Sequence, residues 1–119
     1  MAKKRADVCE LFCYNKAKVN TLKKSLLSDA ELTKLTDIFK VLGDSTRTKI
    51  LLCLAKGELC VCDVAHVLNL SLSAISHQLR LMRNLGLVKY RNEGRMAFYR
   101  LDNDHTMNLV KEGIKQINK

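Results

Sequence analysis

Cysteine is the residue whose spacing says most about the chemistry of this chain. Of the five cysteines, Cys9 and Cys13 are separated by three residues, Cys60 and Cys62 by one, and Cys53 stands apart from both pairs. Two close pairs supply up to four sulfurs, a soft donor set that suits Zn(II) and the softer ions Cd(II) and Pb(II). Neither pair has the C-x-x-C spacing of thioredoxin-like redox sites. The sequence therefore predicts a metal site of Cys9, Cys13, Cys60 and Cys62.

The C-x-C pair restricts the backbone around it. Side chains two residues apart on a helix point about 200° apart, so Cys60 and Cys62 can share an ion only at a helix start or in extended chain. The sequence places both just ahead of a short helix predicted over 63–68, where the helix dipole favours thiolate. Cysteine is also commonly buried as a small apolar residue, and this is what we expect of Cys53 inside an apolar helix.

Apolar residues at helical spacing predict the elements that position these cysteines. Asn69-Leu70-Ser71 predicts a tight turn, because Asn tolerates the left-handed conformation and Ser71 can cap the helix that follows. Two β-prone runs, 87–91 and 96–100, enclose a glycine-containing turn and predict a hairpin. Helices are expected over about 29–42, from a cap at 44 or 45 to near 57, and over 63–68, 72–85 and 103–118.

Two short helices joined by a tight turn and followed by a hairpin have the layout of a winged helix-turn-helix. Small Ala65 falls where the two helices would cross, and Ile75 is the apolar residue that would anchor the second helix on the first. The expected fold class is mainly α with a small β-hairpin. We assign this DNA-binding and dimerisation domain to residues 29–119, and residues 1–28 to an N-terminal arm that carries Cys9 and Cys13.

Positive charge is concentrated in the predicted helix-turn-helix and hairpin. Residues 64–101 hold six Lys or Arg and one acid, a net charge of +5. The rigid fork of arginine fits phosphates and guanine edges, so this segment suits duplex DNA. The alternative is a solvated basic face, which most runs of charge are. The predicted DNA contacts are, on the second helix, Ser71, Ser73, Ser76, His77, Gln78 and Arg80, and, on the wing, Lys89, Arg91 and Arg95.

Composition favours a globular protein that binds a polyanion and argues against a membrane-spanning or secreted one. The 119 residues carry a net charge of +9 and are 47% hydrophobic and 28% charged, which is typical of one globular domain with a polyanionic partner. No apolar run reaches the roughly 20 residues that cross a bilayer, and the basic start lacks the apolar stretch of a signal peptide. We therefore expect a cytoplasmic protein with reduced thiols, and neither a membrane nor a small organic substrate among its partners.

Four stretches of the sequence resemble the ArsR/SmtB family of metal-responsive winged-helix repressors, and the resemblance extends over nearly the whole chain. They are LGDSTR at 42–47, ELCVCD at 58–63, SAISHQL at 73–79 and YRNEGR at 90–95. With CELFC at 9–13, the chain is most similar to the CadC branch, whose members sense cadmium, lead and zinc.

The resemblance implies a homodimer built largely on the first and last helices. It implies an inducer site that joins Cys9 and Cys13 of one subunit to Cys60 and Cys62 of the other. It also implies that the metal-free protein binds double-stranded operator DNA and is released by Cd(II), Pb(II) or Zn(II), which derepresses metal-efflux or resistance genes.

Many members of that branch have a second metal site on the last helix, which this chain matches only in part. His105 agrees with the family pattern, but Asn103 stands in the place of an acid. The later positions of the pattern hold Gln116 and Lys119. We therefore expect the second site to be absent or crippled.

Other interpretations use the same residues. The cysteines could form a thiol-redox switch, an arsenite site of three sulfurs, an iron–sulfur cluster, or a structural zinc site whose chelation would unfold the protein. No nucleophile–base motif or phosphate-binding glycine loop points to an enzyme.

Overall fold

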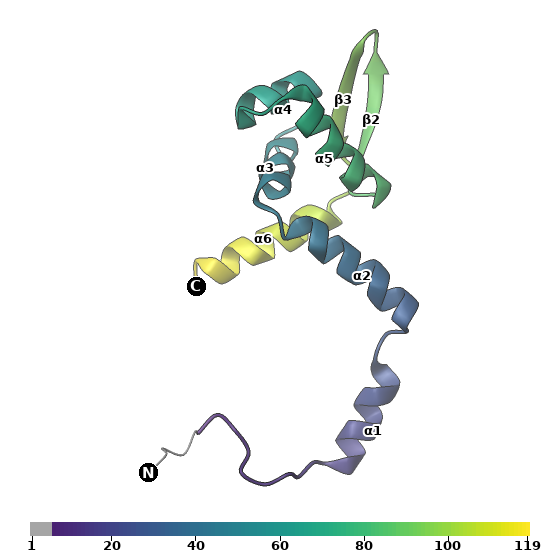
Figure 1. The fold of residues 1–119 in the computed structure, drawn as a ribbon, viewed down its shortest axis with the longest axis vertical. Coiled ribbons are helices and arrows are strands. Elements are labelled where there is room, and N and C mark those ends of the chain that lie inside the picture. Colours follow the sequence, from purple (N-terminus) through teal and green to yellow (C-terminus); the bar gives the residue numbers. More distant parts are fainter. Residues whose placement is uncertain (1–5) are drawn as a thin grey trace. The chain divides into compact units, whose positions relative to one another are not determined.

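The computed structural model describes residues 6–119, so the first five residues of the predicted arm, with its basic cluster, lie outside the described range. The chain divides into two units, residues 1–33 and 34–119, which are described separately (Figure 1). Among the described residues, no helix combines the length and the apolar character needed to cross a membrane.

The first unit contains a helix that the sequence analysis did not predict. Helix α1 spans Lys16–Ser25, and the Asn15 side chain caps it by accepting a hydrogen bond from the Lys18 N–H at 3.0 Å. The helix buries none of its residues, so the apolar periodicity that reveals a packed helix is weak here. Good helix formers and a capping residue account for it instead. Cys9 and Cys13 precede α1 in irregular chain.

Helices α2 and α3 agree with the sequence prediction at their starts. Helix α2 spans Asp29–Leu42 and begins with a capping box, in which Ser28 and Glu31 exchange hydrogen bonds of 3.2 and 3.3 Å. Helix α3 spans Ser45–Leu54, and the Asp44 carboxylate accepts a hydrogen bond from the Arg47 N–H at 3.0 Å. It ends three residues before Gly57, where we expected it to stop.

The two helices of the predicted helix-turn-helix are α4, Val61–Leu68, and α5, Leu72–Asn84. Asn69 between them adopts the predicted left-handed conformation, with φ 56°, and the Ser71 hydroxyl caps α5 by accepting from the Ala74 N–H at 3.1 Å. Helix α4 begins two residues earlier than predicted, because the Asp63 carboxylate accepts the Cys60 N–H at 3.1 Å and closes the first turn there. Cys62 therefore lies inside that turn and not ahead of it.

The wing is a three-stranded antiparallel sheet and not a hairpin alone. Strands β2 (Val88–Glu93) and β3 (Met96–Leu101) form the predicted hairpin, with Gly94 at φ 60° in its two-residue turn. Strand β1 (Leu59–Cys60) pairs with the other edge of β3, so the strand order is β1-β3-β2. Two residues are too few for an alternating pattern, which is why the sequence did not indicate β1.

The core of residues 34–119 lies between α3, α4, α5 and the sheet. Ala65 and Ile75 are both buried, as predicted for the crossing of α4 and α5. The last helix, α6 (His105–Ile117), adds Met107 to this core. The other buried side chains come from α3, α4, α5, β2 and β3 and include Ile50, Leu51, Leu54, Val64, Leu79, Met82, Val88 and Tyr99. The winged helix-turn-helix prediction is confirmed.

Candidate DNA-binding face and cysteine site

Helix α5 turns one face to the core and the other to solvent. Its apolar stripe, Ile75, Leu79 and Met82, is fully buried. The opposite face carries Ser73, His77 and Arg80 in exposed positions, with Ser76 partly buried beside them. This is the geometry of a recognition helix, because the same turn that buries the stripe directs the polar side chains outward.

Gln78 has a partner inside the protein. Arg47 donates from Nη1 to the Gln78 side-chain oxygen at 3.0 Å and from Nε to the Val41 carbonyl at 2.8 Å. One guanidinium therefore joins the end of α2, the start of α3 and the middle of α5. Gln78 keeps only its NH₂ group for a base, so part of its role is to position α5.

Arg91, which the sequence assigned to DNA, is held by acids of its own chain. It bonds to Glu58 through Nε and Nη2, the shorter contact being 2.7 Å, and to Glu93 through Nη1 at 2.8 Å. Its guanidinium also lies over the Phe98 ring, 4.7 Å from the centroid. The hydrogen bond from Arg91 lowers the pKa of Glu58, and the two acids raise the pKa of Arg91. Arg91 thus braces the wing.

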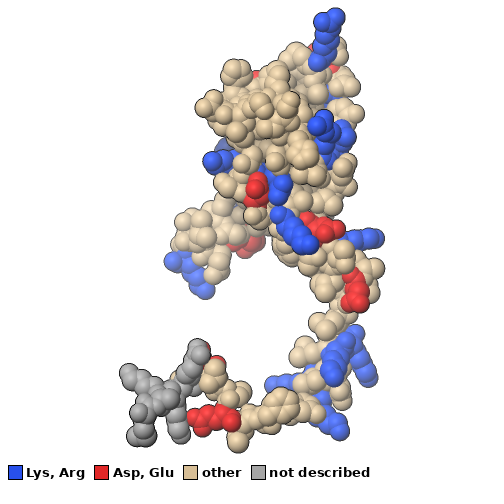
Figure 2. All heavy atoms as spheres, viewed as in Figure 1, with Lys and Arg blue, Asp and Glu red and all other residues tan. Residues whose placement is uncertain are grey.

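The remaining basic side chains of this region are divided between internal contacts and solvent. Lys89 lies 3.6 Å from Asp102, and Arg83 lies over the Tyr90 ring at 4.8 Å. Arg80 and Arg95 are exposed and form no ion pair with any residue in the described range. Figure 2 shows a basic side chain at the tip of the hairpin and others on the body of the same unit.

Cys60 and Cys62 lie at the start of α4 with different exposure. Cys60 ends β1 and is 4% exposed, whereas Cys62 is exposed in the first turn of the helix. Local desolvation, followed by the neighbouring Cys60 thiol, raises the pKa of Cys62. This is opposite to the effect expected from the helix dipole, because desolvation disfavours the charged thiolate and the neighbouring Cys60 thiol adds to that effect. A thiophilic cation between the two sulfurs would remove that penalty.

Both cysteines line a groove of about 250 Å³ that also borders the DNA-binding elements. Ser76 of α5 and Arg95 at the turn of the wing belong to the same lining. The other lining residues are Val61, Leu72, Met96 and Ala97. Side chains from the two predicted sites, the thiolate site and the DNA-binding face, therefore meet in one groove.

The other predicted ligands are distributed over the chain. Cys9 and Cys13 are exposed in the first unit. Within residues 34–119, no three His, Cys, Asp or Glu side chains are positioned to share a metal ion. Cys60 and Cys62 thus supply two donors, and a metal ion bound there needs further ligands from outside residues 34–119 of the same chain.

Cys53 is half-buried on α3, not in the core as predicted.

The positions of the expected second metal site on the last helix hold Asn103, His105, Gln116 and Lys119. Asn103, in the place of the acid, accepts a hydrogen bond from the His105 N–H at 2.9 Å, at the first residue of α6. His105, Gln116 and Lys119 are exposed.

An apolar groove of about 400 Å³ runs between α2 and α6 within the second unit. Phe39, Leu109, Ile114 and Ile117 are 40% to 80% exposed there. Phe39 lies on α2, and Leu109, Ile114 and Ile117 lie on α6. The groove is thus an apolar surface that a monomer would leave in contact with water.

Comparison with known proteins gives one consistent result. The family model for bacterial regulatory proteins of the arsR family matches residues 44–90. A cadmium resistance transcriptional regulatory protein CadC homolog of Staphylococcus aureus is 44% identical over 107 residues, which cover 89% of this chain and 88% of that protein. A transcriptional repressor SmtB homolog of Synechocystis is 37% identical over 105 residues, covering 88% of this chain and 80% of the homolog.

Solved structures agree with the fold. The homodimeric winged helix-turn-helix DNA-binding domain from Mycobacterium bovis superimposes with a TM-score of 0.70 at 28% identity, covering 79% of this chain and 90% of that one. The family match at residues 44–90 includes α4, α5 and the first three residues of β2, and within it lie seven of the nine candidate DNA contacts.

Proposed function

The chain belongs to the ArsR/SmtB family of bacterial transcriptional regulators, and from this premise we propose that it represses a metal-resistance operon and is released by Cd(II), Pb(II) or Zn(II). Its relatives include a cadmium resistance transcriptional regulatory protein of the CadC kind and a transcriptional repressor of the SmtB kind, which are regulators and not enzymes. The observation that carries the proposal is the groove that Cys60 and Cys62 share with α5 and the wing.

Operator binding uses the exposed face of α5 and the unpaired cations near it. Ser73, Ser76 and His77 face the major groove, and the NH₂ group of Gln78 is available to a base edge. Arg80 and Arg95 are free to bind phosphates, whereas Arg91 is already neutralised by two acids. Arg95 is therefore the main basic contact of the wing, and Arg91 supports it from the strand.

A second copy of the chain covers the apolar groove between α2 and α6. Two copies joined there place two α5 helices on one duplex, as a two-fold symmetric dimer requires for successive half-sites. The M. bovis relative is homodimeric, which supports the same assembly here.

The inducer site combines Cys60 and Cys62 with Cys9 and Cys13 of the partner subunit. The fit rests on chemistry present in the structure: two thiols side by side, one exposed and one beneath it, facing a groove with room for further ligands. Four thiolates suit Cd(II), Pb(II) and Zn(II). The arm cysteines precede α1 in exposed, irregular chain, which allows them to adapt to the geometry of an ion.

Two connections link the cysteine pair to the DNA-binding elements. On one side, Cys60 pairs with Phe98 of β3, and Glu58 holds Arg91 of β2, so a shift of residues 58–60 is passed to the wing. On the other side, Cys62 is part of α4, which packs against α5. When the arm cysteines bind the same ion as Cys60 and Cys62, both connections shift the wing and α5 away from the arrangement that fits operator DNA. A coupling of about 1–3 kcal/mol, typical of such linkage, weakens DNA binding about 5- to 150-fold.

A Cd(II) titration of the reduced, metal-free protein on DNA from its own promoter tests this function. Sulfur-to-metal charge-transfer absorbance and DNA binding are recorded together for the wild type, Cys60→Ser and the matched control Cys53→Ser. We expect one ion per subunit and release of DNA for the wild type and for Cys53→Ser, and neither for Cys60→Ser.

Two of the competing interpretations predict other results, one in this titration and one in a parallel treatment with peroxide. Cd(II) binding with unchanged DNA affinity makes the site structural. Release by peroxide without metal, reversed by a thiol reductant, makes the protein a redox switch. Either result overturns the proposed metal response.

A further inference from the structure

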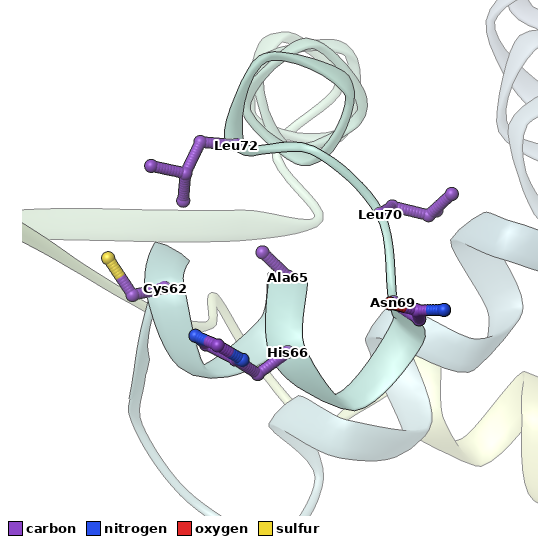
Figure 3. A pocket seen from close by; sticks show the side chains of 6 residues that line it. All are labelled: Cys62, Ala65, His66, Asn69, Leu70 and Leu72. Atoms are coloured by element: carbon purple, nitrogen blue, oxygen red, sulfur yellow. The ribbon is translucent and has the colours of Figure 1, made fainter.

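Helix α4 carries a second metal donor that the predicted cysteine site does not use. Cys62 and His66 are four residues apart on this helix, and both are exposed. Side chains at this spacing are neighbours on one helix face, and they tilt toward the N-terminus of the helix. Figure 3 shows the His66 ring extending toward the side on which the Cys62 sulfur lies. The ring makes no hydrogen bond or ion pair with any residue in the described part of the chain.

The two donors face the same empty space. They line a pocket of about 250 Å³ between α4 and the turn that leads into α5 (Figure 3). Ala65, with its single methyl group, leaves the floor of the pocket open. The remaining lining residues are Asn69, Leu70 and Leu72. A thiol and an imidazole one helical turn apart are a two-point chelate, as are the paired histidines of helical zinc sites.

Cys62 lines this pocket and also the groove on its other side that contains Cys60. An ion bound to Cys62 can therefore take its second helix ligand from either direction. Cys60 is almost completely buried and offers sulfur, whereas His66 is exposed and offers nitrogen. Imidazole suits the borderline ion Zn(II), and a purely thiolate set suits the softer ions.

We propose that His66 is a zinc ligand. Zn(II) is held by the Cys62 thiolate and the His66 imidazole together with arm thiolates of the partner subunit, and Cd(II) and Pb(II) use Cys60 in place of His66. This inference rests on the proposed function, because the arm must supply the remaining donors. One chain would then distinguish borderline from soft ions by the side of Cys62 on which the ion binds.

The test compares metal affinity in four forms of the full-length protein: wild type, His66→Gln, Cys60→Ser and the control Cys53→Ser. We expect His66→Gln to weaken Zn(II) binding about 10- to 100-fold, a scale that even outer-shell partners of ligands reach, and to leave Cd(II) affinity within about threefold. Cys60→Ser shows the reverse order, and Cys53→Ser binds both ions as the wild type does. Gln is a good helix former at this exposed position, and circular dichroism checks that the variant is folded.

Two spectroscopic readouts are independent of affinity. In the wild type, ¹⁵N NMR detects one His66 ring nitrogen becoming metal-bound on Zn(II) loading and neither on Cd(II) loading. Co(II), used as a probe for Zn(II), gives ligand-field bands of a mixed sulfur–nitrogen site that move toward an all-sulfur spectrum in His66→Cys.

A His66 ring that is unchanged by Zn(II), or wild-type Zn(II) affinity in His66→Gln, overturns the inference. Failure of the underlying function gives a different pattern, in which Cys62→Ser alters the affinity for neither ion. The two failures are thus distinguishable.

Discussion

Replacing Asn69 tests whether the backbone conformation of one residue sets the geometry of the helix-turn-helix. Asn69 has φ 56° and ψ 48°, directly after α4. The Leu70 N–H donates to the Ala65 carbonyl at 3.0 Å and the Asn69 N–H to the His66 carbonyl at 3.3 Å. This is the Schellman pattern, which requires a left-handed residue at this position.

The expected magnitudes follow from that conformation. A left-handed residue with a Cβ atom costs about 1–2 kcal/mol, and Asn lowers this cost through its short polar side chain. Asn69→Ala should therefore lower the free energy of unfolding by about 1 kcal/mol. Asn69→Gly removes the strain but gains about 0.4–1 kcal/mol of entropy in the unfolded chain, so it should remain within about 0.5 kcal/mol of the wild type. For a domain of this size, 1 kcal/mol corresponds to roughly 4 °C in Tm.

Urea denaturation of the three proteins, at one protein concentration because a dimer's stability depends on it, gives the comparison. The order expected is wild type and Asn69→Gly together, with Asn69→Ala below both. If Asn69→Ala is as stable as Asn69→Gly, the left-handed conformation is not what Asn69 contributes. If both variants lose stability equally, the amide side chain matters and the backbone argument is refuted.

Three further predictions concern the core and the charges of the second unit. Ile75→Ala removes a fully buried side chain where α5 crosses α4 and should lower the free energy of unfolding by about 2–5 kcal/mol in urea denaturation; a loss below 1 kcal/mol would contradict its place in the core. Arg80→Gln should weaken operator binding and reduce the slope of log K against log salt by about 1 for each subunit bound to the duplex. Arg91→Gln should change that slope little, because Glu58 and Glu93 already neutralise Arg91. Equal slopes for the two variants would refute this division of roles. Because Arg91 lowers the pKa of Glu58, the Glu58 carboxylate stabilises the fold fully above its pKa in the unfolded chain, and this stabilisation is lost as pH falls through its pKa in the folded protein. Glu58→Gln should therefore reduce the loss of unfolding free energy of the metal-free protein at acid pH. An unchanged pH dependence would count against the ion pair.

The sequence by itself determined the helix-turn-helix and the hairpin. Leu72, Ile75, Leu79 and Met82 recur with the period of a helix, and a helix with such a stripe is expected to bury it. The structure buries Ile75, Leu79 and Met82, whereas Leu72, at the start of α5, is 51% exposed. Asn69 predicted the turn because few other residues tolerate its conformation. The C-x-C pair was predicted just ahead of a helix at 63–68. Cys60 does precede α4, but Cys62 lies within its first turn, because the helix begins at Val61.

Other features depended on contacts between residues distant in sequence. Strand β1 forms because Leu59 pairs with Tyr99 of β3. A segment of two residues is too short for its sequence to predict such a pairing. In the sequence, Arg91 and Arg95 are both basic residues of the predicted wing, and nothing there distinguishes their roles. Only the fold brings Glu58, 33 residues away along the chain, against Arg91 and leaves Arg95 free of ion pairs with the described residues.

Sequence and tertiary structure also contribute differently to the two donors beside Cys62, which are Cys60 and His66. Its spacing from Cys60 and His66 is visible in the sequence, but the division between a buried sulfur and an exposed imidazole is not. That division depends on β1 pairing with β3, which covers Cys60, and on the turn at Asn69, which leaves His66 beside an open pocket. Local spacing determines which donors a helix can present, and only tertiary packing decides which of them remain accessible.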